Sequence, residues 1–201
     1  MGGRLTMKII KAMRGVSSMI AAGLVLPLAV NVATGQETVN LADVPGQPID
    51  AAWYRYGNAQ YGIQADIPAE GYVYELSEAG DELSLDSADG ERSISVYGSQ
   101  DVDPRLTGNQ LKLAFAALAA AQIDAMRLGG IEVTQEHIEP FWFEVSATDA
   151  TYLYYQKGLV SEHCPTLTAN LWIKFPVEAQ STFDEVAKRM SQTLSIECAA
   201  Q

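Results

Sequence analysis

Histidine is scarce in this sequence, and common catalytic motifs are missing from it. His137 and His163 are the only two histidines among 201 residues. A G-x-S-x-G nucleophile elbow, a P-loop and a dinucleotide fingerprint are all absent. The sequence therefore favours a protein that is not an enzyme and has no cofactor. Because the members of a catalytic triad can lie far apart along a chain, a hydrolase with an unrecognised site remains an alternative.

The sequence also lacks a recognisable set of metal ligands. Glu162 and His163 are neighbours, but a metal needs three or four converging ligands. Acidic residues gather around a predicted hairpin and before Pro104, without the spacing of an EF-hand: Asp81, Glu82, Asp86, Asp89, Glu91, Asp101 and Asp103. We expect no metal site. Binding of a small ligand or a divalent cation by these acidic loops is an alternative.

Basic residues are few, which excludes a class of partners. The chain has 13 lysines and arginines against 25 acidic residues. Four of the basic residues and none of the acidic ones lie before position 36, so residues 36–201 carry nine basic and 25 acidic residues, a net charge of −16. A surface of this sign repels nucleic-acid backbones and anionic lipids.

The only long hydrophobic run lies at the N-terminus. Residues 16–32 are mainly apolar, basic residues precede them, and Ala33-Thr34-Gly35 supplies small residues for cleavage. Residues 1–35 are therefore predicted to be a signal peptide, with translation starting at Met1 or Met7. We expect a periplasmic or secreted protein. We also expect no membrane span after cleavage, because residues 111–121 are too few to cross a bilayer.

Cysteine is almost absent, but the two that occur form a natural pair. Cys164 and Cys198 lie after the signal, and no C-x-x-C motif is present. An exported protein folds in an oxidising compartment, so we predict a disulfide between them. Closing a loop of roughly 35 residues contributes about 3–4 kcal/mol in the chain-entropy model.

The remaining residues indicate one α+β domain. Residues 36–51, with Pro45, Gly46 and Pro48, are predicted to be a flexible lead segment, and residues 52–201 a single domain. Period-two patterns and turn residues predict strands at 53–56, 61–67, 73–76, 82–86, 93–97, 131–138, 141–147, 151–160 and 166–175. A long helix is predicted between Thr107 and Gly129, and a second from about residue 181, where Thr182 and Glu185 have capping-box spacing. Short connections predict a mainly antiparallel sheet covered by helices.

Aromatic residues are concentrated on two consecutive predicted strands. Trp142 lies on the first strand, and Tyr152 and Tyr154 lie on the second. If these three side chains are exposed, they form a surface that suits a protein partner. The alternative is that helices cover both faces of the sheet and bury them.

Several short segments of the chain resemble, as a set, those of a known protein family. These segments are Tyr56-Gly57-Asn58, Tyr61-Gly62-Ile63, Ile67-Pro68, Asp89-Gly90, Trp142-Phe143-Glu144-Val145-Ser146, Tyr155 with Lys157, and Phe175-Pro176. They resemble exported bacterial proteins with the PsbP/Mog-type fold. They occur in the family's order over residues 53–195. The resemblance implies an antiparallel sheet between helical layers, an α/β/α sandwich. It also implies a non-catalytic role, because the Ran-binding and photosynthetic namesakes are partners of larger assemblies.

These observations lead to one expected function. We expect an exported, non-catalytic accessory or protein-interaction module of the bacterial envelope, with a protein partner that the sequence does not identify. Binding of a small ligand or a divalent cation through the acidic loops is the main alternative.

Overall fold

An eight-stranded sheet forms the centre of the computed structural model, which describes residues 36–103 and 105–197. All neighbouring strands in it are antiparallel. Their order across the sheet is β1 (Gln36–Val39), β5 (Val73–Ser77), β6 (Glu82–Asp86), β7 (Ser93–Ser99), β11 (Cys164–Pro176), β10 (Tyr152–Ser161), β9 (Trp142–Thr148) and β8 (Glu132–Ile138).

A second, smaller sheet packs on one face of the first. Its order is β12 (Ser195–Ile196), β4 (Ile63–Pro68), β3 (Trp53–Asn58) and β2 (Gly46–Pro48). The period-two pattern along β4 places Ile63, Ala65 and Ile67 against the large sheet, where all three are at most 1% exposed. They share one buried cluster with residues of β6, β7 and β11.

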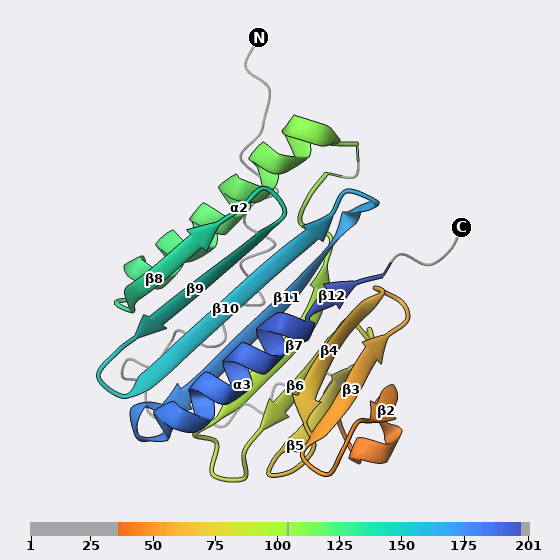
Figure 1. Cartoon of the computed structure of the whole chain (residues 1–201), viewed down its shortest axis with the longest axis vertical. Helices are drawn as coiled ribbons and strands as arrows, with labels where there is room; N and C mark the ends of the chain where they lie inside the picture. Colours follow the sequence, from red (N-terminus) through yellow and green to blue (C-terminus); the bar gives the residue numbers. More distant parts are fainter. Residues whose placement is uncertain (1–35, 104, 198–201) are drawn as a thin grey trace, which may run out of the picture. The chain divides into compact units, whose positions relative to one another are not determined.

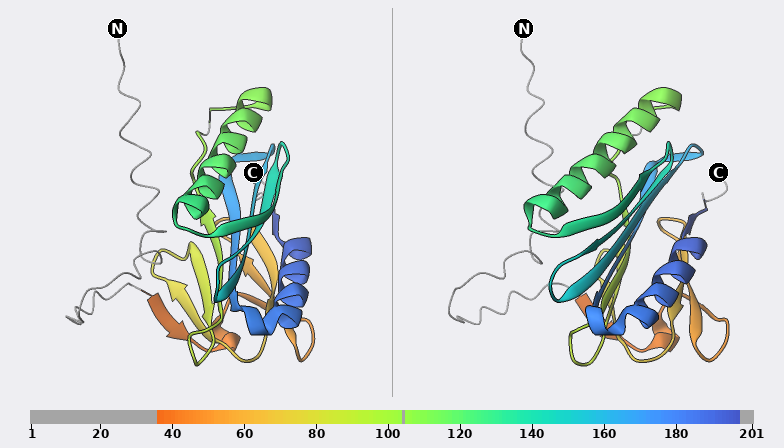
Figure 2. Two further views of the ribbon diagram at one scale, coloured as in Figure 1. Left: turned by 90° about the vertical axis from the view of Figure 1, so that its left-hand side faces the viewer. Right: turned by 60° about the vertical axis from the view of Figure 1, so that its left-hand side comes forward.

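Two long helices complete three layers. Helix α2 (Gly108–Leu128) packs on β8 and β9, whereas α3 (Gln180–Thr193) packs on β4, β10 and β11. Figures 1 and 2 show the two helices on opposite faces of the large sheet, with α3 beside the small sheet. The predicted α+β class, an antiparallel sheet between helical layers, is confirmed. The second sheet was not predicted.

The sequence explains where α2 begins and ends. Thr107 is its N-cap in an extended conformation, and Gly130 follows the helix with a φ of 82°. Buried residues recur at intervals of three or four: Leu111, Phe115, Ala119, Ile123 and Met126. They form one apolar cluster with side chains of β9 and β10. Neither helix of the described ranges is long and apolar enough to cross a bilayer.

The structure corrects two expectations about boundaries. Residues 36–51 are not a lead segment without structure, because they contain β1, the 3-10 helix η1 (Leu41–Asp43) and β2, and Val44 is only 2% exposed. Helix α3 begins at Gln180, directly after the 3-10 helix η2 (Val177–Ala179). Its N-cap is Ala179, so Thr182 lies inside the helix and the predicted capping box does not form.

Gly158 lies within β10, where a glycine inside a strand is often the sign of a bulge, but no bulge occurs at this position. The register shift of β10 lies between Val160 and Ser161, two residues further on. A Cβ atom at Gly158 would come within 2.2 Å of the Phe143 ring on β9. The missing side chain therefore makes room for a buried aromatic ring between the sheet and α2.

Candidate functional site

A groove lies between α3 and the part of the large sheet formed by β9 and β10. It has a volume of about 290 Å³. Glu144, Ser146 and Tyr155 line it from the sheet, and Asp184, Lys188 and Ser191 are among the residues that line it from α3. Figure 1 shows β8 and β9 extending beyond α3 on this face of the sheet. We call this pocket, with the adjoining face of β9, the groove.

A half-buried lysine of β10, Lys157, connects the floor of the groove to α3 through hydrogen bonds. The Lys157 ammonium donates hydrogen bonds to the Ser191 carbonyl at 2.8 Å and to the Ser191 hydroxyl at 3.2 Å. Burial lowers the pKa of Lys157, and the Glu144 carboxylate acts in the opposite direction. Ser191 lies in the last turn of α3, where free carbonyls attract a cation.

Glu144 is held on the same floor by Tyr155. The Tyr155 hydroxyl donates a hydrogen bond of 2.9 Å to Glu144 Oε2. Burial raises the pKa of Tyr155 far above its ordinary value, and the Glu144 charge adds to the effect. The phenol therefore stays neutral and remains a donor.

Trp142 lies beside Glu144 on the same face of β9. Its ring is half-buried and stacks on His137 with the centroids 4.9 Å apart. The Lys157 ammonium lies 5.4 Å from the Trp142 centroid, within the range of a cation–π contact. His137 also contacts Glu139 Oε1 at 2.9 Å, as expected of a polar residue on a sheet surface.

The three aromatic residues predicted as a partner surface do not come together. The register pairs Trp142 with Leu159, so Trp142 faces the α3 side, whereas Tyr152 and Tyr154 pack on the α2 side. Tyr154 is only 8% exposed and donates to Asp149 at 2.6 Å. Successive residues of a strand point to opposite faces, and Trp142 shares the face of its partner Leu159, an odd-numbered position of β10. The even-numbered Tyr152 and Tyr154 therefore point to the other face. Of the three, Trp142 alone adjoins the groove.

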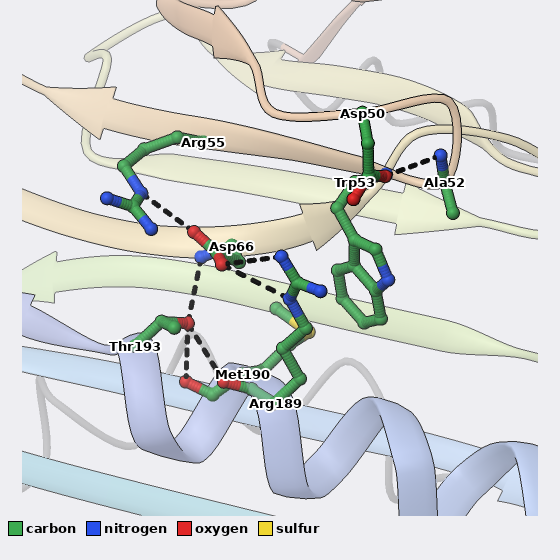
Figure 3. A network of polar contacts seen from close by, with 8 residues as sticks. All are labelled: Asp50, Ala52, Trp53, Arg55, Asp66, Arg189, Met190 and Thr193. Atoms are coloured by element: carbon green, nitrogen blue, oxygen red, sulfur yellow. Dashed lines mark hydrogen bonds and ion pairs between the residues drawn. The ribbon is translucent and has the colours of Figure 1, made fainter.

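Asp66 anchors α3, which forms one wall of the groove. Its carboxylate accepts hydrogen bonds from Arg55 Nε at 2.7 Å and from Arg189 Nε at 3.2 Å, and its side chain is 3% exposed (Figure 3). The Arg189 guanidinium also lies 4.4 Å from the centroid of the Trp53 ring. The Thr193 hydroxyl accepts from the Asp66 amide at 3.0 Å. These contacts join the small sheet to α3.

The acidic loop residues form hydrogen bonds within their own turns. Asp81 accepts from the Ser77 hydroxyl at 2.6 Å, and Asp89 accepts from the Ser87 hydroxyl and the Glu91 amide. Asp103 accepts from Arg105. Within residues 36–103 and 105–197, no group of three or more His, Cys, Asp or Glu side chains has the geometry of a metal site.

Sequence comparison gives no match, but structure comparison does. No family model and no curated protein matches the sequence. Cyanobacterial PsbP from Synechocystis sp. PCC 6803 superposes with a TM-score of 0.54 at 9% identity, over 74% of this chain and 94% of its own. This chain has the PsbP/Mog-type fold. The fold expected from the short sequence segments is thereby confirmed.

Two further solved structures align with this PsbP/Mog-type chain. The Ran-binding protein Mog1p of Saccharomyces cerevisiae has a TM-score of 0.48 at 12% identity, over 73% of this chain and 96% of its own. LpqN of Mycobacterium tuberculosis, described as involved in cell envelope biogenesis, has a TM-score of 0.34 at 11% identity, over 81% and 91%.

The remaining predicted residues lie elsewhere in the PsbP/Mog-type fold. Cys164 is buried at the start of β11, whereas Cys198 and the predicted signal, residues 1–35, lie outside the described residues. The disulfide between Cys164 and Cys198 therefore stays a prediction. His163 is exposed in the turn before β11, and Glu162 lies 4.0 Å from Lys112.

Sequence reasoning missed the residues that shape the groove. Lys157 and Ser191 are 34 positions apart, and no local pattern links them. Asp66 gave no signal either, because it alternates with Ala65 and Ile67 along β4, as a residue on an exposed face would. The folded structure shows that this carboxylate is buried, with Arg55 and Arg189 as its partners.

Proposed function

We propose that this protein is an exported, non-catalytic accessory module of the bacterial envelope, and that it binds a protein partner at the groove. One observation supports this most strongly. Trp142 remains half-exposed next to a concave face that carries charges of both signs, Glu144 and Lys188 among them. Tryptophan is over-represented at the centres of protein interfaces, where a large rigid side chain fills a partner's pocket.

Export is supported by the basic and apolar composition of residues 1–35. A disulfide between Cys164 and Cys198 would stabilise the end of the chain in an oxidising compartment. Binding of a cation by the acidic loops has less support, because Asp81, Asp89 and Asp103 already accept hydrogen bonds from neighbouring groups.

Site-specific crosslinking tests this function. A photo-reactive residue is placed at Gln192, which is exposed and lines the groove. The control position is Leu113, which is 72% exposed on α2. We expect one partner to be captured in cells from position 192 and not from 113, and the capture to be lost in Trp142→Ala. The proposal fails if the two positions capture the same proteins, or if Trp142→Ala leaves the capture unchanged.

A further inference from the structure

Strand β8 is an open edge of the large sheet. It is the last strand in the sheet order, and β9 is its one neighbour within the described residues. Every residue of β8 is exposed except the half-buried Val133. Of the other outer strands, β2 has three residues and β12 two, and β1 starts at the first described residue. With seven residues, β8 is the longest of the outer strands that the structure describes.

The hydrogen-bond pattern shows which backbone groups of β8 point outward. The Glu139 amide donates to the Trp142 carbonyl at 2.8 Å, so these two residues face each other as a hydrogen-bonded pair. In an antiparallel ladder such pairs alternate, which makes His137 with Glu144 the next one. Ile138 lies between these two positions and Glu136 directly before them, opposite Phe143 and Val145, so the N–H and C=O groups of both residues point away from β9. These are the groups that an added strand would bind.

The charge of the β8–β9 hairpin indicates which kind of strand would bind to the edge of β8. Residues 131–148 contain four glutamates, at positions 132, 136, 139 and 144, and no lysine or arginine. The Arg127 guanidinium of α2 lies 2.6 Å from the Glu136 carboxylate, so four negative charges and one positive charge leave a net charge of −3 at this edge. A second copy of this edge would bring like charges together, which is unfavourable. A segment rich in lysine or arginine would gain from the same charges.

We propose that β8 binds an extended, cationic segment of the partner protein as a ninth strand of the large sheet. This inference rests on the proposed function and specifies the mode of binding. Ile138, which is 40% exposed, would offer an apolar contact on the α2 side of that strand. His137, stacked on Trp142, would offer a contact on the groove side. The register shift between Val133 and Gln135 limits regular pairing to the later part of β8.

The probe is a short fluorescent peptide in which lysine and valine alternate. The protein is purified in the form in which cells accumulate it. Binding of the peptide to this protein is measured by fluorescence anisotropy. One control peptide has the same side chains but a methyl group on every second backbone nitrogen, and another has glutamate in place of lysine. We expect both controls to bind about tenfold or more weakly, since one cannot form the ladder and the other is repelled.

A pair of variants at one position tests the outward-pointing amide. Ile138→Pro removes this N–H without removing a bond to β9, and an edge strand tolerates proline there. Ile138→Val keeps the N–H and serves as its control. We expect the proline variant to bind the lysine–valine peptide about tenfold more weakly and the valine variant to bind it normally. Thermal unfolding of both variants verifies that each is folded.

Other results would overturn strand addition. These are absence of peptide binding, equal binding of the methylated peptide, or equal binding by a folded Ile138→Pro variant. Dimers that form through β8 without peptide would show that a second copy occupies the edge. If the partner captured from position 192 is unaffected by Ile138→Pro, the inference fails while the proposed function stands.

Discussion

Replacing Asp66 with asparagine tests the contact that positions α3. Asparagine keeps the size of the side chain but removes its charge and turns an amide donor toward a guanidinium. Hydrogen bonds to a charged group contribute about 1.5–3 kcal/mol each, and Asp66 accepts them from two arginines. The side chains of Arg55 and Arg189 are 44% and 34% exposed, so water can hydrate them after the change. We therefore expect a loss near the lower end of the sum, about 2–4 kcal/mol.

Urea unfolding followed by circular dichroism measures this loss. With a slope of about 2 kcal/mol per molar urea, a loss of 3 kcal/mol lowers the midpoint by about 1.5 M. Asp50→Asn is the matched control. The Asp50 carboxylate accepts from the amides of Ala52 and Trp53 in a turn, and asparagine can accept the same bonds (Figure 3). We expect that variant to lose less than about 0.5 kcal/mol.

A double-mutant cycle separates the contact between α3 and Asp66 from general damage. Arg189→Gln should cost much less in the Asp66→Asn background than in the wild type, with a coupling energy of about 1–2 kcal/mol. If Asp66→Asn is no worse than Asp50→Asn, or if the two changes are simply additive, the carboxylate does not anchor the helix.

Three further changes have outcomes that follow from local contacts. Gly158→Ala should lower the free energy of unfolding by about 1–3 kcal/mol through overpacking, whereas Gly57→Ala, where an added Cβ meets no atom within 4 Å, should change it little or raise it; urea midpoints decide. Burial raises the pKa of Tyr74 to about 12, so its contribution to stability is complete below pH 10 and is lost as the pH rises toward 12. Tyr74→Phe should therefore weaken the alkaline loss of stability, and equal pH profiles of the urea midpoint would contradict this. Reduction of the predicted bridge between Cys164 and Cys198 should lower the free energy of unfolding by about 3–4 kcal/mol, and a thiol assay in denaturant that finds two free thiols before reduction would refute the bridge.

Local patterns predicted most of the helices and strands. The glycines after α2 and its spacing of buried residues gave that helix its correct limits. Alternation along β4 identified its buried face. Such features depend on neighbours within a few positions, so the sequence alone contains them.

The pairing of strands into two sheets could not be predicted in the same way. A period-two pattern shows which residues are buried, but not which sheet covers them. β2 has the proline and glycine of a loop, yet its three residues pair with Tyr54, Arg55 and Tyr56. The groove was missed for a related reason, because its walls come from distant segments that meet only after folding.

The small sheet has a consequence for the timing of folding. Ile63 on β4 pairs with Ile196 on β12, and Asp66 contacts Arg189 and Thr193. More than 120 residues separate these partners in the chain. A polypeptide that leaves a ribosome or a membrane channel N-terminus first therefore completes β4 last, when its final residues emerge. Until then β4, already paired with β3, has one open edge and a carboxylate without its second arginine, and these are features that a chaperone can recognise.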